Sequence, residues 1–540
     1  MNFAIDQSEG NKRRNPTLVW VLIGAVLTAG VFFRFYNLEK KVYWFDEVGT
    51  SLWISGYTWA DVKQMVGDRE IGIRELKRFQ RINPDRGLLS TVTALSVQDP
   101  QHSPLYYGLV RLWAGLFGES VWVIRSLSAF ASLLVFPCLY WLCRELFEMR
   151  RVAWVALMIV AVSPFHVLYA QEARQYSLWT VTILLSSAAL LWALRLHMKR
   201  AWALYAVSVA AGIYTHGLFG LVIIAHGVYV IGNRLAQTGW KLLPLSKTLI
   251  TYLTATLAGV VVFAPWAYMM LTNFPTASRH LSWATQKVNP FYLIGMWGFN
   301  FSAIFLDTDH SLKFVDQYDF SVFLFYSIRV LMLIMALYSI YFLYLKTPKH
   351  SWLFVLAMIV VSSLGLALPD LLLGGIRSGG GYRYLIPSYL GIQLAVAYLL
   401  ATKMNSARFA RRRIWQPVTV FVIVCGIVSC TVSSQAETWW TKPISYYHPR
   451  VARMINQAQH PLLIIGSAGK ILSLSHLLDS KVRIWLVTNN DMVQISEGFS
   501  DVFVFEPSLL LRKKFETNDN FTMKEVDPRG KLWRLVKRHA

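Results

Sequence analysis

Two neighbouring carboxylates, Asp46 and Glu47, close the run Tyr43–Glu47 and could do acid–base chemistry. They follow an apolar stretch and stand beside aromatic residues, where a carboxylate is costly to desolvate and needs a reason to be kept. One interpretation is a general base, or a ligand for a cation, that faces a reacting group. The other is an ordinary helix start, because Asp is favoured at that position. The pair alone leaves both interpretations open.

A second polar group lies in the run Ser163–Tyr176, which contains Glu172 and Arg174. An isolated ion pair at a membrane surface contributes little to stability and is the ordinary interpretation. A functional role is favoured only if this pair lies on the same side of the membrane as Asp46 and Glu47. His102 and His216 are weaker candidates. Each is more often a histidine with satisfied hydrogen bonds than a catalyst or a ligand.

The third group is the glycine run Gly379–Gly381, followed by Tyr382, Arg383 and Tyr384. Glycines let backbone N–H groups approach an anion, and a guanidinium offers forked donors to a phosphate. The alternative is a flexible hinge whose arginine reaches the lipid headgroups.

The composition shows what must position these groups. The chain has 540 residues, of which 55% are hydrophobic and 15% charged, and its mean hydropathy is +0.41. A soluble protein needs more polar surface than this. The net charge of +23 is spread in short clusters between apolar stretches, as membrane orientation requires, which argues against nucleic-acid binding. The cysteines lie in or beside apolar stretches and indicate neither a disulfide framework nor a thiolate metal site: Cys138, Cys143, Cys425 and Cys430.

Apolar stretches long enough to cross a bilayer recur along most of the chain, and we expect about eleven transmembrane helices. The stretch 201–233 is too long for one helix, and Thr215–Gly217 at its middle predicts two helices joined by a turn. The expected spans are 17–37, 126–143, 152–169, 176–194, 201–215, 217–233, 249–271, 320–345, 351–369, 384–402 and 414–434.

Charge sidedness orients these spans. With residues 1–16 as a cytoplasmic segment, the basic clusters fall in the cytoplasmic connections and few basic residues lie in the short outer loops. We therefore expect a multi-pass plasma-membrane protein with a transmembrane domain at 17–434. The three polar groups then share the extracytoplasmic face, which is periplasmic in a bacterium. The outer segments are the first loop 38–125, the loops 165–176, 272–319 and 370–383, the turn at His216, and the tail.

The tail, 435–540, is less apolar. Its short apolar runs Leu462–Ile465, Val482–Val487 and Val502–Phe505, with the segment 471–478 between the first two, predict a small extracytoplasmic α/β domain. It contains no nucleotide-binding glycine pattern.

Carboxylates suited to proton abstraction and arginines suited to phosphate thus converge on the outer face. This arrangement favours transfer from, or to, a lipid-linked phosphate. Nucleotide donors are scarce outside the cell, so an outward-facing transferase would take a group already carried by a lipid.

The same segments give the sequence a resemblance to the GT-C class of membrane glycosyltransferases, within it the protein O-mannosyltransferase and aminoarabinose-transferase-like group. Each motif is short, but their order, spacing and sidedness agree across most of residues 17–402. The segments are Phe45–Glu47, His102–Tyr107 with Gly118–Ser120, Ser163–His166 through Gln171–Arg174, and Arg383–Pro387.

The resemblance implies a GT-C-like α-helical fold whose first outer loop carries helices along the membrane, and the apolar stretch Pro104–Gly118 suits one. It also implies a glycosyltransferase that moves a hexosyl or pentosyl group, with inversion, from a polyprenyl-phosphate-sugar donor to an acceptor hydroxyl. By the same resemblance Asp46 would be the general base, and Glu47 would support it or hold the acceptor. Some members use a divalent cation and others do not, and the adjacent Asp-Glu pair leaves metal use open.

Carried over in the same way, Arg174 and Arg383 would bind the donor phosphate, with Tyr382 or Tyr384 assisting. Glu172 would orient Arg174, and the two histidines named above would support the site. The partners implied are the lipid-linked donor, membrane lipid, and an acceptor that is a protein, a glycan or a lipid.

Two rival readings stand beside this one. A transporter or flippase of lipid-linked envelope intermediates would line its path with the same charges. Transporters often show internal repeats and paired broken helices near the midplane, whereas here there is no repeat and the charges gather at one surface. A non-catalytic scaffold would give no account of the combined carboxylates and arginine.

Overall fold

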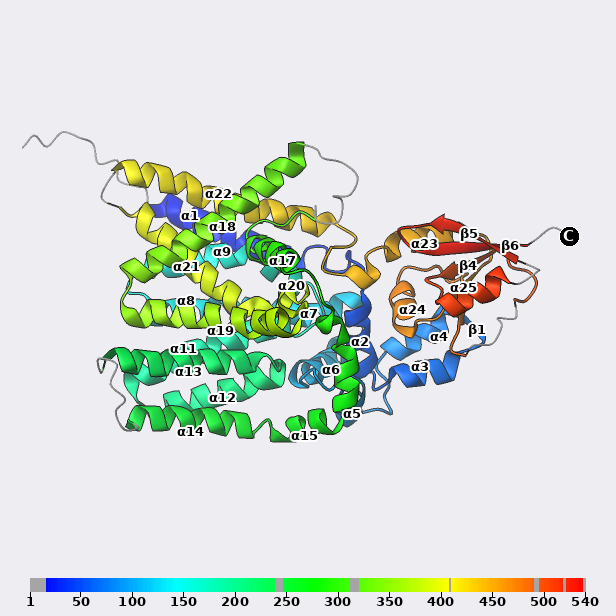
Figure 1. Cartoon of the computed structure of the whole chain (residues 1–540), viewed down its shortest axis with the longest axis horizontal. Coiled ribbons are helices and arrows are strands. Elements are labelled where there is room, and N and C mark those ends of the chain that lie inside the picture. The colour runs from blue at the N-terminus through cyan, green and yellow to red at the C-terminus, as the bar shows by residue number, and fades with distance from the viewer. Residues whose placement is uncertain are drawn as a thin grey trace, which may run out of the picture.

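The computed structural model describes residues 16–237, 246–309, 320–406, 409–489, 495–517 and 521–537. The N-terminal segment expected to be cytoplasmic, 1–16, lies outside these ranges except for Pro16. A bundle of long helices occupies one end of the molecule, and an α/β unit that carries the C-terminal end of the chain occupies the other (Figure 1). The helices of the first loop lie where the two parts meet.

The bundle confirms the multi-pass membrane fold. In the described parts of the chain, eight helices are long and apolar enough to cross a membrane, or up to ten if each of two bent pairs counts as one span. The remaining expected span, 201–215, is the 17-residue helix α12. The single helices are α1 (Pro16–Phe35), α11 (Tyr176–Leu196), α12 (Lys199–Thr215), α13 (Phe219–Gln237), α18 (Phe320–Lys346), α19 (Lys349–Leu373), α21 (Ile386–Met404) and α22 (Phe409–Gln435); α7 (Val121–Leu133) continues into α8 (Val135–Leu146). The 14-residue helix α17 (Pro290–Ala303) is not one of these spans and lies in the expected outer loop 272–319.

The bent pairs are α9 (Arg150–Ala161) with α10 (Pro164–Ala170), and α14 (Lys247–Val261) with α15 (Ala264–Thr272). They bend by 59° and 53° respectively. The second helix of each pair has a proline in its first turn, where the missing N–H costs nothing but the preceding helix cannot continue. The first bend brings the turn that contains Glu172 and Arg174 to the junction between α10 and α11.

The first loop is mostly helical, and its beginning, residues 41–56, is largely buried. Its helix α6 matches the stretch expected along the membrane, and its exposed side is apolar at Leu112, Leu116 and Phe117, as suits a helix in contact with lipid. The elements are α2 (Phe45–Ile54), α3 (Trp59–Val66), β1 (Glu70–Gly72), α4 (Ile73–Lys77), η1 (Arg78–Gln80), α5 (Leu88–Gln98) and α6 (Leu105–Phe117).

The α/β unit contains the three strands expected in the tail, now β2, β3 and β4. Its sheet has the order β1-β3-β2-β4-β6-β5. The central strand β2 is parallel to β3 and β4, and the other pairs are antiparallel. The edge strand β1 comes from the first loop, so two distant segments build one sheet. The tail elements are η5 (Pro443–Ser445), α23 (His448–Asn456), β2 (Pro461–Ile465), α24 (Ala468–Leu474), β3 (Arg483–Leu486), β4 (Asp501–Phe505), α25 (Leu509–Glu516), β5 (Phe521–Asp527) and β6 (Leu532–Lys537).

A shared core joins the unit to the first loop. Val48 and Leu52 of α2 belong to the same cluster of buried side chains as Ile471 and Leu472 of α24. A Cβ on Gly469 would lie 2.3 Å from the ring of Phe45, so this glycine permits the close approach of α24 to the start of α2. The α/β unit therefore packs on the helix that carries Asp46 and Glu47.

Candidate active site at the junction of the bundle and the α/β unit

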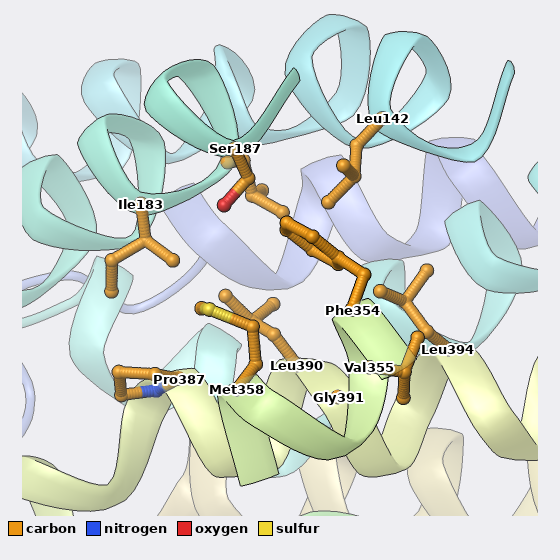
Figure 2. Close-up of a pocket in the computed structure, with 11 residues that line it drawn as sticks. Leu142, Ile183, Ser187, Phe354, Val355, Met358, Pro387, Leu390, Gly391 and Leu394 are labelled. Carbon is orange, nitrogen blue, oxygen red and sulfur yellow. The ribbon is translucent and has the colours of Figure 1, made fainter. Parts of the chain in front are cut away.

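A cavity inside the bundle does not suit a substrate. Figure 2 shows it lined by side chains of α8, α11, α19 and α21. Its volume is about 10 Å³, which is room for at most one water molecule. Ser187 carries the only polar side chain among the lining residues. This cavity is a packing gap, and the ionisable groups lie elsewhere.

Asp46 stands in the first turn of α2, where the positive end of the helix favours a carboxylate. Its Oδ2 lies 3.0 Å from Nη2 of Arg383. The two side chains are 17% and 20% exposed, in that order. The pair is thus open to a small substrate group, unlike the fully buried pairs around it.

Three aromatic rings hold Arg383 in place. Its guanidinium carbon lies 5.4 Å from the ring centre of Trp44, 5.5 Å from Tyr176 and 5.7 Å from Tyr384. Contacts of this kind attract a cation through the ring quadrupole. They fix the guanidinium without using its N–H donors, which leaves these donors to anionic partners such as Asp46.

The side chain of Glu47 points away from that of Asp46, toward the interior, and is fully buried. Successive residues of a helix diverge by about 100°, so Asp46 faces the open side while Glu47 faces the interior. Arg125 donates to both carboxylate oxygens at 2.7 Å, and the N–H of Ala173 donates to Oε1 at 2.8 Å. Nζ of Lys442 lies 3.4 Å from Oε2. Burial favours a higher pKa for Glu47, but Arg125 and Lys442 together hold that pKa below its ordinary value.

Glu172 is also buried, at 1% exposure, and its Oε2 accepts from Lys442 at 3.0 Å. Its contact with Arg174 is through the backbone, where the N–H of Arg174 donates to the Glu172 carbonyl at 2.7 Å. Burial raises the pKa of Glu172, and Lys442 only partly offsets that effect.

Arg174 lies on the buried side of the site and contacts the backbone of Asp46 and the ring of His102. Nη1 donates to the backbone carbonyl of Asp46 at 3.2 Å, and Nη2 donates to Nε2 of His102 at 2.6 Å. The guanidinium carbon lies 5.9 Å from the ring of Trp53 and 5.8 Å from that of Tyr107. The side chain is 2% exposed, so Arg383 has the more open position of the two arginines.

His102 links Arg174 to Asp99. A guanidinium can only donate, so Nε2 of His102 must carry a lone pair and its proton sits on Nδ1. Nδ1 lies 3.1 Å from Oδ2 of Asp99. Burial would raise the pKa of Asp99, but the nearby His102 and Arg174 lower it. His102 thus lies between Asp99 and Arg174, and its hydrogen bond with Arg174 fixes the tautomer of the histidine.

Tyr384, Tyr382 and His216 separate in space. His216 stacks on Trp179 with ring centres 4.2 Å apart and lies 5.7 Å from the ring of Tyr384, so both border Arg383. Tyr382 faces the interior, with its ring 4.9 Å from that of Trp440. Among the described residues its hydroxyl has no hydrogen-bond partner. The structure therefore brings Tyr384, but not the Tyr382 hydroxyl, toward the arginine.

Sequence reasoning missed two cations of this site, Arg125 and Lys442. Arg125 stands in the first turns of a span, where an arginine ordinarily reaches toward the headgroups. Lys442 lies in the tail, outside every motif. No local signal singles out either residue, because their role depends on carboxylates distant in the chain.

An open groove of about 520 Å³ borders the site between α3, α5 and α16 (Phe274–His280). The ring of Trp59 stacks on Phe45, with centres 5.7 Å apart, and Phe45 precedes Asp46. His280 lies close enough to Asp99 to lower its pKa. The lining residues include three basic side chains and no carboxylate: Trp59, Ala60, Lys63, Val97, Gln98, Thr276, Arg279 and His280.

No metal-binding cluster is evident in the described ranges, where no three His, Cys, Asp or Glu side chains lie together in a suitable arrangement. The carboxylates of Asp46 and Glu47 diverge. Both oxygens of Glu47 already accept from Arg125, so these two residues do not share one cation site in this arrangement.

Comparison with known proteins agrees with this architecture. The family model described as dolichyl-phosphate-mannose-protein mannosyltransferase matches residues 101–269, a range that contains His102, Arg174 and His216. No curated protein matches the chain.

The structural likeness extends further along the chain. ArnT from Cupriavidus metallidurans bound to undecaprenyl phosphate has 13% sequence identity and a TM-score of 0.51 over 97% of this chain and 98% of that one. Its apo state gives the same values. The oligosaccharyltransferase AglB from Archaeoglobus fulgidus has 12% identity and a TM-score of 0.49 over 86% of this chain and 64% of that one. The ArnT likeness shows the fold. Together, the family match and the fold confirm the resemblance to GT-C membrane glycosyltransferases and indicate a glycosyltransferase.

Proposed function

We propose that the chain transfers a sugar from a polyprenyl-phosphate-linked donor to an acceptor hydroxyl on the extracytoplasmic face. The observation that carries this proposal is the partly exposed pair of Asp46 and Arg383. A carboxylate that can take a proton and an arginine that can bind a phosphate lie side by side, at the one end of the bundle that the first loop covers (Figure 1).

The chemistry follows from the positions of these groups. The acceptor oxygen forms a bond to the anomeric carbon, and Asp46 receives its proton. The bond from the anomeric carbon to the donor phosphate breaks, and the phosphate leaves with the electron pair. Arg383 binds that phosphate and stabilises the growing charge. Arg174 supports both groups from the buried side, through the backbone of Asp46.

The resting ion pair implies an order of binding. Until the donor arrives, Arg383 occupies the carboxylate of Asp46 in an ion pair. A donor phosphate competes for the same guanidinium and so frees the carboxylate. The donor therefore binds before the acceptor, and a molecule without its donor is protected from unproductive proton transfer.

We place the acceptor in the groove between α3, α5 and α16. Its volume falls within the range of ordinary ligand sites, about 300 to 1,000 Å³. The stacked Trp59 and Phe45 lead from the groove to Asp46. Lys63, Arg279 and His280 line it without a balancing carboxylate, so an acceptor that carries an anionic group near its hydroxyl fits this wall.

Several observations support the donor class and the orientation. The matching family description contains a lipid-phosphate sugar, and ArnT was crystallised with undecaprenyl phosphate. The distribution of basic residues favours a cytoplasmic N-terminus, which would place this site and the α/β unit outside.

Asp46→Asn tests the proposal in native membranes supplied with undecaprenyl-phosphate-linked hexoses and pentoses. The measurement is release of undecaprenyl phosphate, which requires no knowledge of the acceptor. Loss of a general base costs roughly 100- to 10,000-fold in rate. The matched control is Asp479→Asn, at an exposed position of the α/β unit. Release at the wild-type rate by Asp46→Asn contradicts the assignment of the base.

The same membranes distinguish the transporter alternative. A flippase would carry the lipid-linked sugar across sealed vesicles without releasing undecaprenyl phosphate. Translocation without cleavage by the wild-type chain would replace the transferase proposal with that alternative.

A further inference from the structure

Lys442 is a buried cation that the tail inserts beneath the candidate site. It stands between the end of α22 and η5, and its side chain is 1% exposed. Nζ lies 3.0 Å from Oε2 of Glu172 and 3.4 Å from Oε2 of Glu47. It also lies 5.1 Å from the ring centre of Trp44. A buried lysine is costly unless carboxylates compensate it, and here two do.

The two carboxylates belong to the two segments that carry the site. Glu47 is the neighbour of Asp46 on α2, and Glu172 precedes Arg174 by two residues. The N–H of Ala173, between Glu172 and Arg174, donates to Glu47 at 2.8 Å. Lys442 thus joins the first turn of α2 to the turn before α11 at the point where Asp46 and Arg174 must meet.

The tail also fixes the start of α2 by neutral hydrogen bonds. The N–H of Phe45 donates to Ser445 Oγ at 3.2 Å, and Ser473 Oγ donates to the carbonyl of Tyr43 at 2.7 Å. The ring of Trp44 contacts both Lys442 and Arg383. The tail therefore reaches the backbone on both sides of Trp44 and, through its ring, the proposed phosphate-binding arginine.

The charges around Lys442 show what its removal would do. Arg125 compensates Glu47 directly, whereas Glu172 has its one ion pair among the described residues with Lys442, and Arg383 acts on it from farther away. The nearby Lys41 donates to Gln171, and burial lowers its pKa to about 7. Without Lys442, two buried carboxylates would face each other with Arg125 as their main counter-charge, and they would repel.

We propose that Lys442 is a positioning residue of the active site, and that the tail serves catalysis by supplying it. This inference rests on the proposed function. Lys442 holds Glu47 and Glu172 together, and so sets the spacing between Asp46 and Arg174. A displacement of about 1 Å between such groups can cost on the order of 100-fold in rate.

The test compares Lys442→Met with the double variant Glu172→Gln/Lys442→Met, in the membrane assay for release of undecaprenyl phosphate. We expect the single variant to lose about 10- to 100-fold and the double variant to recover most of that loss, because it removes the uncompensated carboxylate together with the lysine. The matched control Lys470→Met removes a lysine that pairs with Glu506 inside the α/β unit, and its rate should stay unchanged.

The pH profile provides a second readout that a packing role would not change. Burial raises the pKa of Glu172, so in Lys442→Met this residue takes up a proton as the pH falls, and the repulsion with Glu47 disappears. The ratio of the wild-type rate to the variant rate should therefore grow with pH. Arg125, Arg383, Lys41 and Trp44 face the same cluster and are unchanged in both proteins.

The outcomes separate the two proposals. Wild-type activity in Lys442→Met, or a double variant no better than the single one, overturns the role of Lys442. No release of undecaprenyl phosphate by the wild-type chain overturns the proposed function instead. If Lys442→Met does not fold, Glu172→Gln/Lys442→Met compared with Glu172→Gln alone gives the same decision, because the inference expects these two variants to have similar rates.

Discussion

The carboxylate of Asp46 and the guanidinium of Arg383 lie 3.0 Å apart, although most of the bundle separates them in the chain. The adjacent ion pair differs sharply in exposure. Glu47, the residue after Asp46, pairs with Arg125, and both of these side chains are completely buried. One ion pair is thus structural and the adjacent one accessible. In the proposed mechanism these two groups are paired with each other at rest, and the donor phosphate must break that pair.

Arg383→Gln should weaken use of the donor. Removing one preorganised donor to a developing charge costs about 100- to 1,000-fold in rate. Arg383→Lys should give an intermediate rate, because a lysine keeps the charge but not the forked geometry. The measurement is kcat/KM for the undecaprenyl-phosphate-linked sugar.

Arg450→Gln is the control, since Arg450 pairs with Asp527 in the α/β unit. Equal kcat/KM in Arg383→Gln and the wild-type chain would remove Arg383 from the donor site.

Glu47→Gln should act mainly on stability. Breaking a buried ion pair from one side costs about 3 to 5 kcal/mol, and Arg125 would be left with its charge uncompensated. The native pKa of Glu47 is held below the ordinary carboxyl value. Its contribution to stability is therefore present above the unfolded pKa and is lost as the pH falls below it. Thermal unfolding of the purified protein as a function of pH measures both effects.

Glu437→Gln is the matched variant, because Glu437 forms an exposed pair with Arg453. Such pairs contribute about 0 to 1 kcal/mol. Similar losses in the two variants would mean that burial of Glu47 does not matter.

Lys41 predicts a pH dependence of the same sign as that of Glu47, but in a higher pH range. Burial, together with the charges of Lys442 and Arg125, lowers the pKa of Lys41 from 10.5 to about 7. Between these values the unfolded chain binds more protons than the native one, so stability should rise with pH, by at most about 1.4 kcal/mol per pH unit. Lys41→Met should remove this slope. Lys40→Met, at the exposed neighbouring lysine, should preserve the slope. The measurement is the midpoint of unfolding of each variant between pH 7 and 10.

The groove predicts a charge effect on the acceptor alone. Lys63→Glu combined with Arg279→Glu should raise the KM for an anionic acceptor on the order of 10-fold, which corresponds to about 1.4 kcal/mol. The KM for the donor should not change. Lys513→Glu combined with Lys514→Glu, on α25 away from the groove, is the charge-matched control. A rise in the donor KM instead would assign the groove to the donor.

Hydropathy and charge sidedness predicted much of this architecture. Apolar length alone indicates where a helix crosses, and the turn at His216 is present between α12 and α13. The expected convergence of Asp46, Arg174 and Arg383 depends only on which end of each span is outside. Their catalytic roles stay predictions, because sidedness does not determine chemistry.

The rest required three-dimensional information. Whether Glu47 faces the open side or the interior depends on where α2 begins. A shift of the helix start by one residue would turn each side chain by about 100°. Strand β1, Glu70–Gly72, has three residues, too few to show an alternating pattern, and its partner β3 lies in the tail. Lys442 has no motif because its partners are distant in sequence.

The pairing of β1 with β3 has a consequence for biogenesis. Strand β1 is synthesised before most of the bundle, whereas Lys442 and the partner strand β3 are synthesised after it. Before then the first loop cannot pair its strand β1, and Glu172 has no lysine beside it. A chain that stops before the tail would therefore hold a first loop with an unpaired strand, and under the proposed function its activity would require the tail.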